Sequence, residues 1–176
     1  MLNELETARY RLRVPSLDDA ATVTALVQDP RIYRMVSRIP PEQTIEQTGQ
    51  WILGAQRGNE LGIDHTTLVL ENGAVIGAVG AHRAAASEPF EIGYWLVPEA
   101  WGKGAATEVA GAIIAWLEER DLADTLVSGH FEDNPASGRV LAKLGFKPTH
   151  SSLVYCAGRG GEVEHVYLRR NRRDLV

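Results

Sequence analysis

The chain has 176 residues, of which 44% are hydrophobic and 23% are charged, and its formal net charge is -5. This length suits one compact domain, and the composition is that of an ordinary folded, soluble protein. We therefore expect residues 1–176 to form a single domain. The negative charge argues against nucleic acid as a partner, because such binding needs dense Lys or Arg contacts with phosphates.

Membrane insertion and export are not expected. The first six residues lack the positive charge and apolar run of a signal peptide, and no later run is long enough to span a membrane. The single cysteine, Cys156, excludes an intramolecular disulfide and cannot alone build a cysteine metal cage. We therefore predict a cytoplasmic protein with no membrane partner and no metal.

The first third of the chain predicts one strand and two helices. Residues 9–14 alternate arginine with apolar side chains, as in a strand with one buried face. A capping box at Ser16 predicts a helix from about residue 17 to 28. After a proline-rich break, helical spacing predicts a second helix that begins near residue 45 and ends near Gly58.

Strands are predicted in the middle of the chain. Residues 67–71 and 74–79 are rich in β-forming side chains and are joined by Asn72-Gly73, which favours a two-residue hairpin. Residues 90–97 alternate again and read as a central strand. Because side chains alternate along a strand, Glu91 and Trp95 should share one face.

A glycine loop follows this strand and precedes a helix. Gly102 and Gly104 carry no Cβ, so a bulky anion could approach the backbone there. The first amides of a helix lack partners within the helix, and the helix dipole adds partial positive charge. The loop therefore resembles a pyrophosphate cradle, although it matches neither the Walker pattern nor the three-glycine dinucleotide pattern.

A second junction of strand and helix follows. Residues 126–131 predict a strand, and Asn134-Pro135 has the N-cap and first-turn residues of a short helix that Gly145 should end. Two such junctions direct polar backbone groups toward one crevice. The chain should finish with an antiparallel pair at 152–157 and 162–168, and its arginine-rich end is expected in solvent.

Several motifs in register resemble the GNAT acetyltransferases, and within them the RimJ/RimL-like branch. They run in order through Glu91-Ile92-Gly93-Tyr94-Trp95-Leu96, Trp101-Gly102-Lys103-Gly104-Ala105-Ala106-Thr107-Glu108, Asn134-Pro135-Ala136-Ser137 and Leu144-Gly145-Phe146. The resemblance implies an α/β fold, α+β by some schemes, with a mixed, mostly antiparallel, splayed sheet flanked by helices on both faces. It also implies acetyl-CoA as the donor and direct transfer to a primary amine.

The same resemblance implies which residues hold acetyl-CoA. Backbone groups around Trp95, Leu96 and Val97 would meet the pantetheine arm. Amides of the glycine loop would hold the pyrophosphate, helped by Lys103. The implied loop residues are Trp101, Gly102, Lys103, Gly104, Ala105, Ala106 and Thr107. Asn134 would face the pantetheine, or it would serve only as a helix cap.

Catalytic candidates follow from the chemistry of amine acetylation. An ammonium group must lose a proton before it attacks a thioester, and Glu91 is the first candidate for the base, ahead of His130. Many relatives carry a tyrosine as the acid at the position of Leu141 here. Ser137 resembles the hydroxyl used instead in the RimL-like branch, with Tyr155 as a further substitute.

The acceptor stays open at this stage. The resemblance implies that Tyr33, Met35, Trp51 and Tyr155 shape the acceptor site. The branch favours a protein N-terminal amine, while a small amine or an aminoglycoside is the alternative. A protein of another class, an acyl-CoA-binding sensor or docking domain without turnover, is also considered, and a homodimer is left open.

Overall fold

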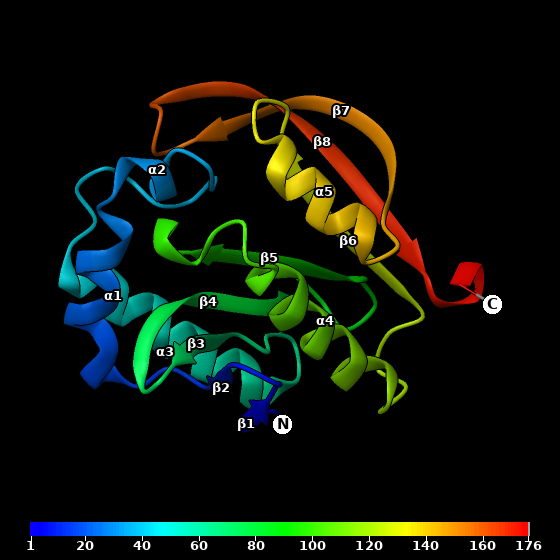
Figure 1. The fold of residues 1–176 in the computed structure, drawn as a ribbon, viewed down its shortest axis with the longest axis horizontal. Coiled ribbons are helices and arrows are strands. Elements are labelled where there is room, and N and C mark those ends of the chain that lie inside the picture. Colours follow the sequence, from blue (N-terminus) through cyan, green and yellow to red (C-terminus); the bar gives the residue numbers. More distant parts are fainter. Residues whose placement is uncertain (176) are drawn as a thin grey trace.

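The computed structural model describes residues 1–175, in which eight strands form one sheet with helices on both faces (Figure 1). The strands are β1 (Glu4–Glu6), β2 (Arg11–Arg13), β3 (Thr67–Glu71), β4 (Ala74–His82), β5 (Phe90–Leu96), β6 (Thr125–Phe131), β7 (Lys147–Cys156) and β8 (Gly161–Asn171). The α-helices are α1 (Ala20–Val27), α2 (Pro30–Tyr33), α3 (Ile45–Leu61), α4 (Ala105–Glu118) and α5 (Pro135–Lys143). Short 3₁₀ turns cover Leu17–Asp19, Pro98–Ala100 and Arg172–Leu175.

The sheet opens in its middle. Its order is β1-β2-β3-β4-β5-β6-β8-β7, and every neighbouring pair is antiparallel except β5 and β6. These two parallel strands pair at Phe90 with Leu126 and at Glu91 with Val127, and then they diverge. Ser128 Oγ donates to the carbonyl of Ile92 at 2.7 Å beside the point of divergence. The expected mixed, mostly antiparallel, splayed sheet is therefore confirmed.

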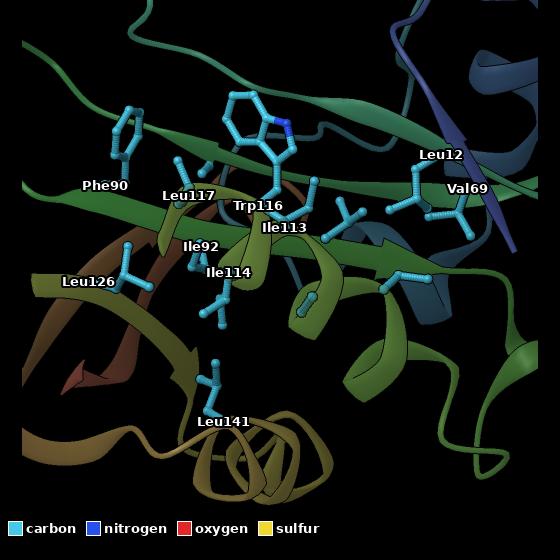
Figure 2. Packing of buried hydrophobic residues seen from close by; sticks show 14 of the residues in the cluster. Leu12, Val69, Phe90, Ile92, Ile113, Ile114, Trp116, Leu117, Leu126 and Leu141 are labelled. Carbon is cyan, nitrogen blue, oxygen red and sulfur yellow. The ribbon is translucent and has the colours of Figure 1, made fainter. Parts of the chain in front are cut away.

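A large apolar core joins the two halves of the sheet on one face. Figure 2 shows Ile113, Trp116 and Leu117 of α4 beside strand residues such as Ile92, with Leu141 of α5 facing them from the other half. Leu141 is fully buried. Burial of this kind stabilises by about 25 cal/mol per Å² of apolar surface, so α4 and α5 hold the diverging halves together where strand pairing is lost.

The opposite face of the first half-sheet is covered by α1 and α3. Val23 and Val27 of α1 are buried against Leu68 and Ala78 of the sheet, with Trp95 packed at the margin. Tyr94 and Trp95 thus face opposite sides of β5, as the alternation of a strand requires. The two faces of β5 therefore have different surroundings, which matters for the site.

Local signals predicted several elements correctly. Asn72 and Gly73 have φ angles of 51° and 84°, which confirms the hairpin turn between β3 and β4. The capping box at Ser16 is formed with Asp19. Gly145, with a φ of 85°, lies directly after α5 and its C-cap residue, as expected.

Other expectations were wrong. The helix expected to end near Gly58 continues to Leu61. Gly58 does not end the helix but allows close packing, since a Cβ there would lie 2.4 Å from Asp64 Cβ. Gly62, with a φ of 71°, ends the helix instead. The arginine-rich end is not wholly in solvent, since Arg170 is buried and its Nη1 lies 2.5 Å from Glu118 Oε1. Strand β1 and helix α2 were not predicted, and strands β7 and β8 are longer than expected.

The contacts of Asp19 predict that the stability of the protein depends on pH. Its carboxylate receives Arg13 Nη2 at 2.6 Å and Nη1 at 2.8 Å, and hydrogen bonding to Arg13 lowers its pKa from 3.8 to about 2. A lowered folded-state pKa adds stability above the unfolded value, and this contribution is lost as the pH falls from 3.8 toward 2. Asp19→Asn should cost about 2 kcal/mol at pH 7. Urea unfolding should show that cost shrinking below pH 4, and a cost independent of pH would contradict this account.

Candidate active site

Two cavities meet at the gap between β5 and β6. One has a volume of about 550 Å³ and lies beside the glycine loop and α5, and we call it the loop cavity. The other, of about 640 Å³, lies beside α1, α3 and the sheet, and we call it the acceptor-side cavity. Met35, Val36, Tyr94 and Trp95 line both cavities. A molecule in one cavity can therefore reach a molecule in the other through the opening of the sheet.

The glycine loop forms the positive end of the loop cavity. Gly102 and Gly104 have φ angles of 72° and 79°, in the left-handed region that favours glycine. Gly104 is the N-cap of α4, and no side chain caps this helix start. The first amides of α4 and its dipole therefore suit an anionic group.

A network from the N-terminal segment braces this loop. Arg9 Nη1 donates to the carbonyl of Lys103 at 3.0 Å, and its Nη2 lies 2.7 Å from Glu108 Oε2. Thr7 Oγ1 donates to the other carboxylate oxygen of Glu108 at 2.7 Å. The backbone of the loop is thus fixed from outside, which leaves its inner amides directed toward the cavity.

The loop cavity also carries cationic side chains at its edge. Arg31 of α2 lines it, together with Arg139 and Lys143 of α5, which lie one helical turn apart. Cations beside a helix N-terminus favour a ligand with several phosphates. The lining therefore fits the pyrophosphate and phosphate groups of a coenzyme A molecule.

The open edge of β5 offers backbone groups to an extended ligand. Val97 N donates to Ile76 O on the β4 side, so the alternation of a strand turns the backbone groups of Tyr94 and Leu96 toward the gap. Those of Trp95 face β4, which corrects the expectation that they meet the pantetheine arm. The indole Nε1 of Trp101 already donates to Leu96 O at 2.8 Å. Tyr94 N–H, Tyr94 C=O and Leu96 N–H thus suit the amides of a pantetheine arm.

The start of α5 brings two hydroxyl groups together. Asn134 Oδ1 accepts from Ser137 N at 3.2 Å, so Asn134 does cap the helix, and both residues line the loop cavity. Ser137 Oγ lies 2.8 Å from the hydroxyl of Tyr94 on β5. Burial raises the pKa of Tyr94 to about 12. This hydroxyl therefore keeps its proton at neutral pH and can support Ser137 as a proton donor.

Glu91 lies in the acceptor-side cavity beside a histidine. Its Oε2 is 3.4 Å from His82 Nε2, an ion-pair distance without hydrogen-bond geometry. The neighbouring His82 lowers the pKa of Glu91, while partial burial raises it to a smaller extent. The carboxylate is half exposed and ionised at neutral pH, so it can accept a proton from a group in this cavity.

The structure does not bring every candidate to the gap. His130 lines the acceptor-side cavity, but its Nδ1 lies 2.8 Å from Phe131 O and its Nε2 packs toward Gly138, where a Cβ would be 2.7 Å away. Tyr155 is 62% exposed on β7 and lines neither cavity. Among the cofactor-binding candidates, Val97 and Lys103 are absent from the lining of the loop cavity.

The residues that line the loop cavity include most of the cofactor-binding candidates. They are Trp95, Leu96, Trp101, Gly102, Gly104, Ala105, Ala106, Thr107, Asn134 and Ser137. Met35 and Trp51 line the acceptor-side cavity as expected, and Tyr33 does not. Their roles stay predictions, and the backbone groups of Trp95 face β4 rather than the gap.

Three residues of the site were missed by sequence reasoning. Tyr94 was placed on a face of β5 without its partner Ser137, which is 43 residues away. His82 lies opposite Glu91 in the β4–β5 register, and the long connection between these strands leaves that register undetermined by any turn signal. Arg9 reaches the loop at Lys103 O from 94 residues away, and no sequence signal marks that contact.

The structure has no membrane-spanning helix and no metal-binding cluster among residues 1–175. No described helix is long and apolar enough to cross a membrane. No group of three or more His, Cys, Asp or Glu side chains is arranged to hold a metal ion.

Comparison with known proteins identifies the family. The chain matches the acetyltransferase (GNAT) domain over residues 9–147. A Bacillus subtilis (strain 168) protein described as the uncharacterized N-acetyltransferase YoaA is 31% identical over 149 residues, covering 81% of this chain and 82% of that protein.

Solved structures share the fold at low sequence identity. RimL, the ribosomal L7/L12 alpha-N-protein acetyltransferase in complex with coenzyme A, has a TM-score of 0.84 at 16% identity over 96% of this chain and 98% of that chain. The ribosomal-protein-S5-alanine acetyltransferase of Vibrio fischeri has a TM-score of 0.82 at 20% identity over 97% of each chain. MccE, the microcin C7 self-immunity acetyltransferase in complex with acetyl-CoA and AMP, has a TM-score of 0.79 at 16% identity over 93% of each chain.

The family match covers most of the chain, and the loop cavity fits the ligand that this family uses. The glycine loop, the cationic edge and the open edge of β5 suit the phosphates and the pantetheine arm of acetyl-CoA. The chain therefore belongs to the GNAT acetyltransferase family and is an acetyl-CoA-dependent N-acetyltransferase.

Proposed function

We propose that this acetyltransferase moves the acetyl group of acetyl-CoA to the N-terminal amine of a protein or peptide. One observation carries the proposal: the two cavities meet at the gap, with Glu91 lining the acceptor-side cavity and Ser137 lining the loop cavity. Relatives of the same fold are described as acetylating ribosomal proteins, which supports a protein N-terminus as the acceptor.

In this mechanism, Glu91 accepts a proton from the acceptor ammonium, directly or through water. The neutral nitrogen then bonds to the acetyl carbon, and the C–S bond of the thioester breaks as the thiolate of coenzyme A leaves. The Ser137 hydroxyl gives that thiolate a proton, supported by the hydroxyl of Tyr94 at 2.8 Å. The nitrogen loses its second proton as the amide forms, and this proton returns to Ser137 directly or through water. Leu96 N–H on the open edge of β5 stabilises the negative charge that develops on the carbonyl oxygen, which leaves Tyr94 N–H and C=O for the amides of the pantetheine arm.

A small amine is the second candidate for the acceptor. The acceptor-side cavity has a volume of about 640 Å³, which is in the range of small-molecule sites. Trp51 and Trp95 give it an apolar wall. Its carboxylates, Asp64 and Glu91, would suit a cationic amine, including an aminoglycoside.

The test combines binding and turnover in one sample. Calorimetric titration with acetyl-CoA should show binding, and thiol release should then be measured with N-terminal peptides, polyamines and aminoglycosides. Thiol release that is faster with N-terminal peptides than with small amines supports the proposal. Thiol release only with small amines overturns it in favour of the second candidate. Binding without release to any amine overturns both and favours an acyl-CoA sensor. We also propose that the protein acts in the cytoplasm, since a single cysteine suits a reducing compartment.

A further inference from the structure

The turn between β7 and β8 is joined to the segment that follows α2. Ala157 N donates to Ser37 O at 2.8 Å, and Cys156 Sγ lies 3.4 Å from Val36 O. Gly158 packs so closely that a Cβ there would lie 2.2 Å from Tyr33 O. We call residues 33–37 and 156–159 together the roof. Figure 1 shows the β7–β8 turn lying beside α2, far from it in sequence.

Arg159 of the roof contacts both the segment after α2 and the residues after β6. Its Nε donates to Arg34 O at 2.7 Å. Its Nη1 and Nη2 donate to the two carboxylate oxygens of Asp133 at 2.7 and 2.9 Å, and its guanidinium lies 4.9 Å from the ring centre of Phe131. The Arg159 side chain is 14% exposed. Asp133 is 57% exposed, so the pair holds its geometry through its bidentate contact and the shielded guanidinium, and not through burial of the carboxylate.

These contacts lie beside the junction of the two cavities. Met35 and Val36 of the roof line both cavities. Asp133 directly precedes Asn134 of the loop cavity, and Phe131 lines the acceptor-side cavity. The pairing between β5 and β6 ends at Glu91 and Val127, before β6 reaches Phe131. Through its bonds to Arg34 O and Asp133, Arg159 therefore joins the segment after α2 to the residues after β6, where no β5–β6 pairing fixes their separation.

We propose that Arg159 is a positioning residue that holds the roof closed over the junction, so that the acceptor amine meets the thioester and water does not. The inference rests on the proposed acetyl transfer. A misplacement of about 1 Å between reacting groups can cost on the order of 100-fold in rate. An open roof also admits water, whose oxygen bonds to the acetyl carbon while the C–S bond breaks, giving acetate and the coenzyme A thiol.

The test uses three changes at the pair. Arg159→Ala removes both contacts, Asp133→Asn removes one charge, and Arg159→Lys keeps the charge but loses the bidentate fork. Each variant is assayed for thiol release with and without acceptor, for acetyl-CoA binding by calorimetry and for melting temperature. The acceptor is the best amine found for the unaltered protein.

A glycine pair supplies an independent test that leaves every charge in place. Gly158→Ala places a methyl group against Tyr33 O and should push the roof apart. Gly161→Ala is the matched control, because a Cβ there meets nothing within 4 Å and its φ is not in the left-handed region. Gly161→Ala should behave as the unaltered protein.

We expect Arg159→Ala and Gly158→Ala to raise the acceptor KM or lower kcat about tenfold or more, and to raise thiol release without acceptor several-fold. The Kd for acetyl-CoA should change less than about threefold, because the glycine loop is not part of the roof. Asp133→Asn and Arg159→Lys should fall between these variants and the unaltered protein. Unchanged acceptor kinetics and unchanged hydrolysis in folded Arg159→Ala would overturn the inference, as would parallel losses in Gly161→Ala.

Failure of the proposed function has a different signature. If the unaltered protein transfers acetyl groups to no amine, the acceptor proposal fails. The rates of hydrolysis without acceptor in the unaltered protein and in Arg159→Ala still test whether Arg159 holds the roof closed. If transfer occurs but Arg159→Ala changes only the melting temperature, Arg159 is a structural residue and the inference fails alone.

Discussion

Gly104→Asp should raise the Kd for acetyl-CoA about 100-fold or more while the protein still folds. Gly104 begins α4, where the amides and the helix dipole favour an anion. A carboxylate there would lie within a few ångströms of the bound phosphates. Two unit charges 4 Å apart near a protein surface repel by about 4 kcal/mol, and each 1.4 kcal/mol is tenfold in affinity. Calorimetric titration measures the change directly.

Gly104→Asn is the matched control for this experiment. Asparagine has the shape of aspartate, and both residues tolerate the left-handed conformation that the φ of 79° requires. The Asn variant should bind acetyl-CoA at least tenfold more tightly than the Asp variant. A Cβ at this position would lie 3.7 Å from Arg9 Nη2, so the added side chain fits without collision. Equal affinities for the Asn and Asp variants would show that phosphate does not lie at this helix start.

Glu91→Gln should lower kcat about 100-fold with little change in the Kd for acetyl-CoA. The carboxylate faces the acceptor-side cavity, and positioned general bases contribute about 10²- to 10⁴-fold. Gln keeps the size of the side chain and removes its basicity. Steady-state kinetics with the identified acceptor, together with calorimetry, separate the two effects. Unchanged turnover would remove Glu91 from the mechanism.

The pH profile of this variant gives a second criterion. His82 lowers the pKa of Glu91, so the ionised, basic form is present at and above neutral pH and is lost only as the pH falls below the usual carboxyl range. Protonation of Glu91 should therefore lower kcat only below about pH 4.5, the ordinary pKa of this side chain, and this fall is the acidic limb of the pH profile. Ser137→Ala is the contrast: it should lower kcat and leave that acidic limb in place. An acidic limb that is identical in Glu91→Gln would contradict the role of Glu91.

Much of the fold could be predicted because its signals are local. The Asn72-Gly73 turn and the Asn134 cap depend on residues within a few positions of each other. The glycine loop was predicted to bind an anion because helix starts have the same chemistry in any fold. Such features need no knowledge of tertiary contacts, so one sequence is enough to find them.

The rest depended on contacts between distant segments. The roof joins residues about 120 positions apart, as in the contact of Cys156 Sγ with Val36 O. The pairing of His82 with Glu91 depends on a strand register that no tight turn fixes. Arg170 was expected in solvent because a charged tail is usually exposed, yet Glu118 and Leu144 O supply it with partners. In each case tertiary structure decided what local pattern could not.

The early end of the β5–β6 pairing leaves an unpaired strand edge inside the sheet rather than at its border. Unpaired edges attract other extended chains, and proteins usually protect them by covering or shortening them. Here Trp101 covers part of that edge through its bond to Leu96 O. In the proposed binding mode, the pantetheine arm of acetyl-CoA takes the place of a missing strand, so the molecule that is consumed in the reaction would also complete the architecture of the enzyme during each turnover.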